Sequence, residues 1–587
     1  MPERESEMLN KLSLVFNTVR YMTPRQWRYR LYYMVRNRFR SGTPKEAPKN
    51  LKAKKVPTVY DGNISNPSAV LVADEIMKGN FPTVAGEVRD LSEGWSLPNE
   101  PYRLICFRLN SFRWLLELSD AYQETGNEKY IQKGYELIQD WHEKMGGKIH
   151  GDAWNPYVIA ERITNWIGFA SKYFRDEYMQ EVACIIYPQA MELMESIEYQ
   201  LGANHLLSEA KALVLAGMFL QNTDLYKTGK YLLLDEAREQ FLPDGGHYER
   251  SVSYHVEALQ QYFEAFVAMR SRNDSDASRI HYFMYEPYRF LNSMIRVNST
   301  IPLFNDAAYD YPFYNAVDFL ATANYLFADP APNGKAGNYA KRWAWIGHEY
   351  IEMLWYDTPS SYYTGILHHK FEAGGEEYSF NMDCGDNGPE YNQGHAHADA
   401  LSILLCSKYK DIIVDTGVLT YQPGEDRDYC RSTSAHNTVE INDKNSAEVW
   451  GAFRTARRGH TKFENKSNKH CYHIRAWHDG YVKCLKSPVM HTRDVNIRDG
   501  RIVIKDTVDA VVPAKAISRF HLSPNCSVEM ESPHELLIDG HIRLKTDGYA
   551  NLADCMVAAW FGEAKSTKCI EIDFCGMREI ETKFIFE

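Results

Sequence analysis

The spacing of apolar residues changes once along the chain, near residue 360. From about residue 100 to residue 355, apolar side chains recur at three- and four-residue steps, which is the period of an amphipathic helix. One such stretch ends at Gly126, and another begins at Pro156, a favourable first-turn residue. Further helical stretches are predicted at 179–200, 205–221, 224–240, 253–271, 280–297, 314–327 and 338–354. Short loops between them predict a barrel-like stack of helix pairs.

After residue 360 the pattern becomes a two-residue alternation, which is typical of strands with one buried face. The pairs Asp499-Gly500 and Asp539-Gly540 are turn signals between such strands. Strands are predicted within 377–385, 400–407, 411–417, 437–442, 482–487, 499–508 and 583–587. This region is therefore expected to be an antiparallel sandwich or a stack of sheets.

A basic segment precedes both regions. Residues 20–40 contain seven arginines and no acidic residue, with aromatic residues interleaved. We interpret the segment as an amphipathic helix docked on the body; a contact with a membrane surface or an anionic sugar is the alternative. The Pro- and Lys-rich stretch 41–57 reads as a linker. The predicted organisation is thus 1–60 for the basic helix and linker, 61–360 for the helical domain and 361–587 for the β domain.

Length and charge limit the function classes. A chain of 587 residues is too long for one core, so two or three domains are expected. The net charge of −12 argues against nucleic acid as a partner, and a polyanionic substrate would need a local basic cleft. Aromatic residues make up 13% of the chain and offer flat faces for sugar rings, although large helical cores would use them equally well. Nothing in the sequence indicates an oligomeric state.

The cysteines and the N-terminal residues bear on the compartment. Eleven cysteines without a C-x-x-C pair favour reduced thiols. The sequence MPERESEMLN has acidic residues where a signal peptide needs basic ones, and no run approaches the roughly 20 apolar residues of a membrane helix. We therefore expect a soluble, cytoplasmic protein without stable membrane insertion, or a periplasmic or secreted one if a leader has been trimmed.

The densest chemical signal is the segment GHAHADALSILL at 394–405. On a strand, His395, His397 and Asp399 would point to one face. Asp415 and His436 follow in two further segments, together with Tyr429 and Arg431. Two histidines and one aspartate from three strands would form a borderline metal site, most naturally for Zn²⁺ or Mn²⁺. The alternative is unrelated core histidines with satisfied N–H groups.

Two more clusters lie in the helical region. Asn204 and His205 are predicted at a helix start, where backbone donors are exposed. Tyr254 and His255 are predicted just inside another helix, after a glycine-rich turn. For each cluster alone, ordinary capping and packing explain the residues as well as a function does.

Taken together, these segments resemble a known family. GHAHADALS, VDTG and RSTSAHNTV in the β region, with WNPYVIAERITNWI, NHLLSEAKAL and DGGHYERSVSYH in the helical region, are similar to the heparinase II and III superfamily of polysaccharide lyases. The resemblance covers roughly residues 100–450. It implies a multidomain chain, α then β: an incomplete (α/α) toroid followed by an antiparallel β-sandwich, with the active cleft between them.

The implied activity is β-elimination on a uronate chain. Its expected substrates are glycosaminoglycans of the heparin/heparan sulfate, chondroitin or hyaluronan type. Alginate or a bacterial exopolysaccharide is the alternative substrate class, and a non-catalytic or hydrolytic sugar-processing protein is the alternative function. A hydrolase would need two carboxylates about 5 to 9.5 Å apart in the cleft. The motifs instead offer tyrosine, histidine and asparagine.

The resemblance also implies roles for single residues. Asn204 and His205 would neutralise the uronate carboxylate. Tyr254 and His395 would serve as base and acid, with Tyr429 as a weaker second acid. His397, Asp415 and His436 match the ligands of a structural divalent metal, Zn or Mn. Arg162, Arg431 and Trp154 are expected to contact the anionic substrate, with structural salt bridges as the alternative for the arginines.

Overall fold

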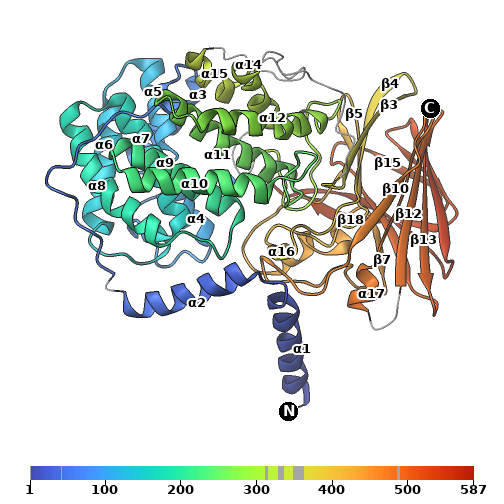
Figure 1. Cartoon of the computed structure of the whole chain (residues 1–587). Coiled ribbons are helices and arrows are strands. Elements are labelled where there is room, and N and C mark those ends of the chain that lie inside the picture. Colours follow the sequence, from blue (N-terminus) through green and yellow to red (C-terminus); the bar gives the residue numbers. More distant parts are fainter. Residues whose placement is uncertain (1, 41, 311–314, 328–335, 348–362, 486–488) are drawn as a thin grey trace.

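The computed structural model describes the whole chain except residues 1, 41, 311–314, 328–335, 348–362 and 486–488. A helical half, residues 2–346, lies beside a β half that begins at residue 366 (Figure 1). No helix in this described part is both long and apolar enough to span a bilayer.

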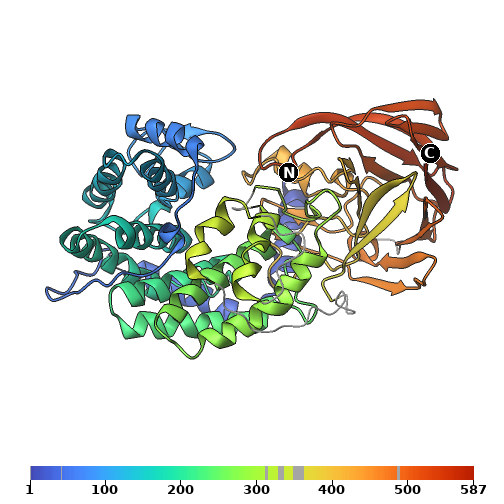
Figure 2. The same cartoon turned by 90° about the horizontal axis from the view of Figure 1, so that it is seen from above.

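The helical half contains two N-terminal helices and a larger helical body. The helices are α1 Pro2–Val19, α2 Pro24–Phe39, α3 Pro67–Lys78, α4 Arg103–Asn110, α5 Leu115–Thr125, α6 Lys129–Met145, α7 Pro156–Tyr173, α8 Asp176–Glu195, α9 Ala203–Phe219, α10 Thr223–Gln240, α11 Val252–Ser271, α12 Ala277–Ser293, α13 Ala316–Leu320, α14 Ala323–Leu326 and α15 Asn338–Arg342, with 3₁₀ turns η1 Val59–Asp61, η2 Asp152–Trp154 and η3 Ala344–Ile346. From α3 onward they follow an open ring when seen from above (Figure 2). Helices α7, α9 and α11 are buried on almost every side, as inner helices of a large body must be.

Close packing of the ring depends on small residues where helices cross. A Cβ at Gly217 of α9 would lie 2.4 Å from the backbone nitrogen of Tyr226, and one at Gly229 of α10 would lie 2.5 Å from the Ala210 carbonyl. The two helices pack too closely there for any side chain. Either glycine replaced by alanine would push the α9–α10 pair apart.

The β half is built from antiparallel sheets. Its strands are β3 Ile366–Ala373, β4 Glu376–Asp383, β5 Ile403–Ser407, β6 Asp411–Ile413, β7 Val439–Ile441, β8 Val449–Trp450, β9 Arg454–Thr455, β10 Thr461–Asn465, β11 Tyr472–His478, β12 Val489–Arg498, β13 Arg501–Ala510, β14 Ala516–His521, β15 Val528–Ser532, β16 Glu535–Ile538, β17 Ile542–Thr546, β18 Tyr549–Val557, β19 Lys565–Asp573 and β20 Glu579–Phe586; α16 Glu425–Cys430, η4 Thr433–Ala435 and α17 Gly480–Cys484 interrupt them. A small ribbon, β1 Phe81–Pro82 with β2 Val88–Arg89, lies in the helical half.

An eight-stranded sheet, ordered β10-β11-β12-β13-β20-β17-β16-β15, forms the outer layer. Two four-stranded sheets, β18-β19-β14-β7 and β3-β4-β5-β6, accompany it. Buried and less buried residues alternate along β12 and β13, so one face of this hairpin packs on the sandwich core. Asp499 and Gly500 both have positive φ in the two-residue turn between Arg498 and Arg501, as a tight hairpin requires.

Most of the fold prediction is confirmed. The helical half precedes antiparallel sheets, α5 ends before a left-handed Gly126, and α7 begins at Pro156. The helix predicted at 314–327 is instead two short helices in its described part, and within the described part of 338–354 the chain forms α15 followed by the 3₁₀ turn η3. The predicted boundary at 360/361 falls outside the described residues.

One predicted strand is wrong, and so is the placement of three site residues on a strand. Within 482–487, the described residues to Cys484 belong to helix α17, because Tyr481 is buried and donates to the Val439 carbonyl; a short apolar run cannot distinguish the two structures by period. His395, His397 and Asp399 lie in the loop before β5, which begins only at Ile403. Their side chains are therefore placed by contacts with other loops and not by strand alternation.

Candidate active site

The starts of the three inner helices meet at one place. Tyr157 opens α7 and Asn204 opens α9, and both donate hydrogen bonds to Glu257 near the start of α11. The Asn204 Nδ2–Glu257 Oε2 distance is 3.2 Å. Helix N-termini carry a partial positive charge, so three of them together favour an anionic group in front of them.

His205 lies beside this junction and is partly exposed. Its Nδ1 is 2.7 Å from Glu198 Oε2, and its ring packs on Tyr157 with 4.6 Å between the centroids. Burial is the largest single influence and opposes the charged ring, but the nearby carboxylates, Glu198 first among them, together raise the pKa of His205. The charged imidazole is therefore stabilised next to Asn204, as neutralisation of a carboxylate requires.

Tyr254 from α11 and His395 from the β half lie ring on ring. Their centroids are 3.8 Å apart and the planes are tilted by 30°. The Tyr254 hydroxyl is 2.9 Å from the hydroxyl of Tyr421. Tyr254 is buried, whereas His395 is partly exposed. A phenol and an imidazole from the two halves of the molecule thus form one contact.

Asp306 fixes the direction of His395. This buried carboxylate accepts from His395 Nδ1 at 3.0 Å through one oxygen and from His397 Nε2 at 2.8 Å through the other. The guanidinium of Arg427 donates to both oxygens. Burial alone would raise the pKa of Asp306, but Arg427 and the two imidazoles hold it well below its ordinary value. An ionised Asp306 selects the His395 tautomer with the proton on Nδ1, which leaves Nε2 as the free acceptor.

Glu257 is the carboxyl group nearest to Asn204. It is completely buried on α11, one turn after Tyr254. Burial and the nearby Glu161 carboxylate raise its pKa to about 7, against the opposing effects of His395, Arg108 and His205. Its hydrogen bond holds one N–H of the Asn204 amide, so the other N–H is left for a ligand.

The predicted metal ligands are close to one another. His436 Nδ1 lies 2.7 Å from Asp415 Oδ2, and the ring centroids of His436 and His397 are 5.2 Å apart. His397 Nδ1 and His436 Nε2 are buried without a hydrogen-bond partner among the described residues. Across those residues, no group of three or more histidine, cysteine, aspartate or glutamate side chains is arranged to hold an ion. Two orphaned imidazole nitrogens beside a carboxylate nevertheless match the donor chemistry of a zinc site.

Three other predicted residues lie away from the Tyr254–His395 pair. Arg162 is fully buried, donates to the Asn110 and Ala153 carbonyls and lies over Trp141. Trp154 is buried and donates to the Met145 carbonyl. Both side chains thus bind backbone carbonyls inside the helical half; Arg162 forms no salt bridge with a described residue, and the substrate contacts predicted for the two residues stay predictions. Within the described chain, no contact joins Tyr429 to Tyr254 or His395, and burial raises the Tyr429 pKa.

Arg431 is also fully buried, but it lies next to the site. Its guanidinium donates to the Ala396 and Gly451 carbonyls. Burial and the nearby Arg427 lower its pKa to about 9. Arg431 thus holds the backbone of the loop that carries His395 and His397, and its guanidinium offers no surface to a sugar.

Sequence reasoning missed Asp306, Tyr421, Glu257 and Arg427. Asp306 stands in the stretch LFNDAA, with no histidine or second acidic residue to mark it. Glu257 follows the Tyr254 motif by three residues, so helical spacing was a usable signal. For Tyr421 and Arg427, 167 and 121 residues from their partners, no local pattern was available.

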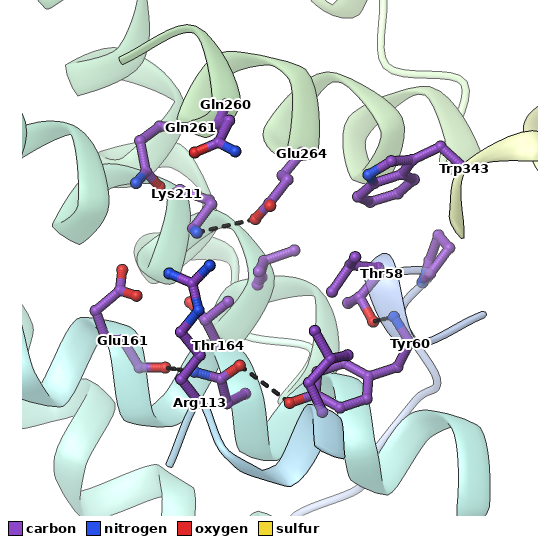
Figure 3. Close-up of a pocket in the computed structure, with 15 residues that line it drawn as sticks. Thr58, Tyr60, Arg113, Glu161, Thr164, Lys211, Gln260, Gln261, Glu264 and Trp343 are labelled. Atoms are coloured by element: carbon purple, nitrogen blue, oxygen red, sulfur yellow. Dashed lines mark hydrogen bonds and ion pairs between the residues drawn. The ribbon is translucent and has the colours of Figure 1, made fainter. Parts of the chain in front are cut away.

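A cavity inside the helical ring is separate from this site. It is lined by α7, α9 and α11 and contains the Lys211–Glu264 ion pair and the Tyr60–Asn165 hydrogen bond (Figure 3). None of the predicted site residues lines it. Glu161, which lines this cavity, is the carboxylate that acts together with burial to raise the pKa of Glu257.

Two sequence families match the chain over most of its length. Residues 50–327 match the family described as Heparinase II/III N-terminus, and residues 363–572 match Heparinase II/III-like, C-terminal.

The curated relatives are distant in sequence, and each alignment covers only part of the relative's length. A heparin-sulfate lyase from Bacteroides thetaiotaomicron is 24% identical over 415 residues, which cover 63% of this chain and 56% of the relative. A heparin-sulfate lyase from Bacteroides stercoris is 23% identical, with 64% of this chain and 60% of the relative covered. The chain thus spans little more than half the length of the curated relatives it matches.

Solved structures share the fold. A crystal structure of heparinase III has a TM-score of 0.66 at 16% identity, covering 97% of this chain and 93% of that one. Chondroitin AC lyase from Streptomyces coelicolor, in complex with chondroitin sulphate, has a TM-score of 0.52 at 9% identity, covering 88% and 78%.

Proposed function

Since the chain belongs to the heparinase II/III family, we propose that it is a polysaccharide lyase that cleaves uronate chains by β-elimination. The contact between Tyr254 and His395 carries the proposal. It joins two groups capable of proton transfer, one from each half of the molecule, and Asn204 bonds to Glu257 one helical turn after Tyr254. The glycosaminoglycan lyases among its relatives and structural neighbours support the reaction class.

The first step is neutralisation of the uronate carboxylate. The C5 proton becomes acidic only when the charge that develops on that carboxylate is stabilised. Asn204 has one N–H free beyond its bond to Glu257, and His205, whose charged form is favoured by Glu198, follows it on α9. The positive ends of α7, α9 and α11 add to the same effect.

The second step moves two protons. A base removes the C5 proton, the electron pair forms the C4=C5 double bond, and the C4–O4 bond breaks as an acid protonates O4. His395 has a free Nε2 because Asp306 holds its Nδ1 proton, so it serves as the base for one C5 epimer. The Tyr254 hydroxyl, paired with Tyr421, is the acid there. For the opposite epimer the roles are reversed, and that reaction starts with the Tyr254 phenolate as the base and His395 protonated on both nitrogens as the acid.

We propose a glycosaminoglycan as the substrate class. The heparin-sulfate lyase relatives and the chondroitin lyase neighbour support this class over alginate. The acidic net charge means that attraction of a polyanion depends on the local groups described above.

A divalent metal is proposed at His397, Asp415 and His436. The orphaned nitrogens of the two histidines support it. When bound, a metal such as zinc would tie the His395 loop to the segments that carry Asp415 and His436. His397 also binds Asp306, so the site would steady the carboxylate that orients His395.

One assay tests the function directly. The protein is incubated with heparan sulfate, chondroitin, hyaluronan and alginate while ultraviolet absorbance from the new double bond is followed. Absorbance with a glycosaminoglycan supports the proposal. Absorbance with alginate alone would mean that the substrate is alginate and that the proposed substrate class is wrong. New reducing ends without absorbance would mean hydrolysis and would overturn the lyase assignment.

A further inference from the structure

The two N-terminal helices, α1 and α2, form an arm that is distinct from the body. Residues 20–23 join them, and α1 stands away from the rest of the molecule (Figure 1). We use the name arm for residues 8–40, whose side chains the structure describes.

The arm is attached through its polar side. On α1, Ser13 accepts from Arg457 and Thr18 accepts from Trp450, both in the β half. Arg458 lies over the ring of Tyr21 at 3.7 Å, at the joint between the helices. An amphipathic helix docked on a globular body normally buries its apolar stripe, so α1 is attached the opposite way round.

Helix α2 docks on the helical body through tyrosine and arginine side chains. Tyr29 stacks on Tyr199, and the Tyr33 hydroxyl bonds to the Ile197 carbonyl. Arg36 and Arg40 pair with Glu192. These contacts occupy one face of α2 and leave the opposite face to solvent.

The outward faces of both helices are apolar. Large apolar side chains more than one third exposed are Met8, Leu9, Leu12, Val15, Phe16, Trp27, Leu31, Tyr32, Met34, Val35 and Phe39. They recur at three- and four-residue steps, which makes a continuous stripe on each helix. A stripe of this extent on a monomeric protein indicates an interaction surface.

The charge of the arm is opposite to that of the molecule. Residues 8–40 contain eight lysine and arginine residues and no acidic residue, in a chain of net charge −12; Glu3, Arg4, Glu5 and Glu7 precede them in α1, so residues 1–40 hold nine basic and three acidic residues. Arg28, Arg30 and Arg38 are exposed between the apolar residues of the outward face of α2. A second copy of this chain would offer the same basic arm, so an arm-to-arm contact would bring like charges together, and a sulfated sugar would not bury leucine, methionine and phenylalanine.

We propose that the arm lies on an anionic lipid bilayer surface. Apolar side chains would enter the headgroup boundary while arginines meet lipid phosphates, the arrangement typical of interfacial helices. The arm packs on the β8–β9 hairpin through Trp450 and on Arg457 just after it, and the ring of Phe453 in the hairpin turn faces His395. When the arm lies on the bilayer, the candidate active site is therefore held near polysaccharide chains at that surface.

Vesicle flotation with the full-length protein tests the proposal. Vesicles of phosphatidylcholine alone are compared with vesicles that also contain phosphatidylglycerol, at low and high salt. The protein is expected to float with the anionic vesicles at low salt and to be released by salt. Equal binding to neutral vesicles, or no binding to either kind, overturns the proposal.

Matched variants separate the arm from the rest of the surface. The triple change Arg28→Gln, Arg30→Gln and Arg38→Gln should lower the partition coefficient by roughly a hundredfold. Leu31→Gln, Val35→Gln and Phe39→Gln should abolish flotation. The control Val511→Gln, Val512→Gln and Met530→Gln, at exposed positions of the β half, should leave flotation unchanged. Loss of flotation in the control overturns the assignment to the arm.

Two further readouts identify any other occupant. If the wild type sediments as a dimer that the apolar variant dissociates, and does not float, the arm binds a second copy and the proposal is wrong. If it binds heparin through the three arginines but not vesicles, the arm is a polysaccharide contact and the proposal is equally wrong. Activity on soluble chains should persist in all variants, because the arm contributes no group to the Tyr254–His395 site.

Discussion

Two buried aspartates of this protein have nearly the same partners and different surroundings. Asp306 lies at the candidate active site and accepts hydrogen bonds from Arg427, His395 and His397. Asp506 lies in the sandwich core. Both of its oxygens accept hydrogen bonds from Arg493, and one of them also accepts from His491. In both places an ion pair is combined with an imidazole hydrogen bond in a fully buried setting.

The difference lies in the second nitrogen of each imidazole. His491 Nδ1 is 3.3 Å from His478 Nε2, so that ring is engaged on both sides and buried. His395 Nε2 has no hydrogen-bond partner among the described residues, and its ring is partly exposed against Tyr254. The same carboxylate chemistry thus stabilises the fold in one place and leaves a reactive nitrogen in the other.

The largest effect is expected from Tyr254→Phe. Loss of a positioned acid or base should lower kcat by roughly 10²–10⁴-fold while the Kd for substrate changes little. Tyr262→Phe is the matched control on the same helix, since among the described residues its hydroxyl bonds to the Leu233 carbonyl alone. Single-turnover absorbance and binding titration measure the two quantities; substantial activity in Tyr254→Phe would remove the phenol from the mechanism.

The aspartate pair is compared directly with Asp306→Asn and Asp506→Asn. Each change breaks a buried ion pair, so the free energy of unfolding should fall by about 3–5 kcal/mol in both. Only Asp306→Asn should also lower kcat, by about a hundredfold or more, because the His395 tautomer is no longer held. Urea unfolding and kcat of the folded fraction test this; equal kcat losses in the two variants would contradict the special role of Asp306.

The raised pKa of Glu257 predicts a pH-dependent stability. Its pKa is about 7 in the folded protein, above the reference value of about 4.3 for the unfolded chain. Between these values the folded state binds more protons, so the free energy of unfolding should fall as pH rises, by up to about 3 kcal/mol. Glu257→Gln removes this contribution, and the difference between variant and wild type at pH 5 and pH 8 measures it. An identical pH slope in both proteins would contradict the prediction.

The metal proposal is tested by His397→Ala. Metal content and thermal stability should fall together, the latter by several degrees, since a buried imidazole is lost as well. His368→Ala, at a partly buried histidine bonded to the Ser293 carbonyl, should lower stability without changing metal content. If elemental analysis of the wild type finds no ion, the ligand assignment is wrong.

The smallest effect separates two tyrosines. Tyr421→Phe removes the hydrogen bond to Tyr254. It should lower kcat by roughly tenfold, which corresponds to the net free energy of about one hydrogen bond. Tyr429→Phe should leave kcat unchanged, because no described contact links it to the site. A larger loss in Tyr429→Phe than in Tyr421→Phe would restore Tyr429 as the second acid.

The sequence by itself determined the order of the two halves and the places of Asn204 and Tyr254. Periodicity is a local consequence of backbone geometry, so the change from helical to alternating spacing could be read directly. Helix starts are also locally encoded, which is why Pro156 and the segment before Tyr254 were interpreted correctly.

Only the tertiary structure decided which groups meet. Asp306 reaches His395 across 89 residues, and Tyr421 reaches Tyr254 across 167. The apolar stripe of the arm was visible in the sequence, but its outward direction was not. A pattern of residues defines a face, whereas the neighbour that covers that face, or leaves it open, depends on contacts between segments that local geometry does not encode.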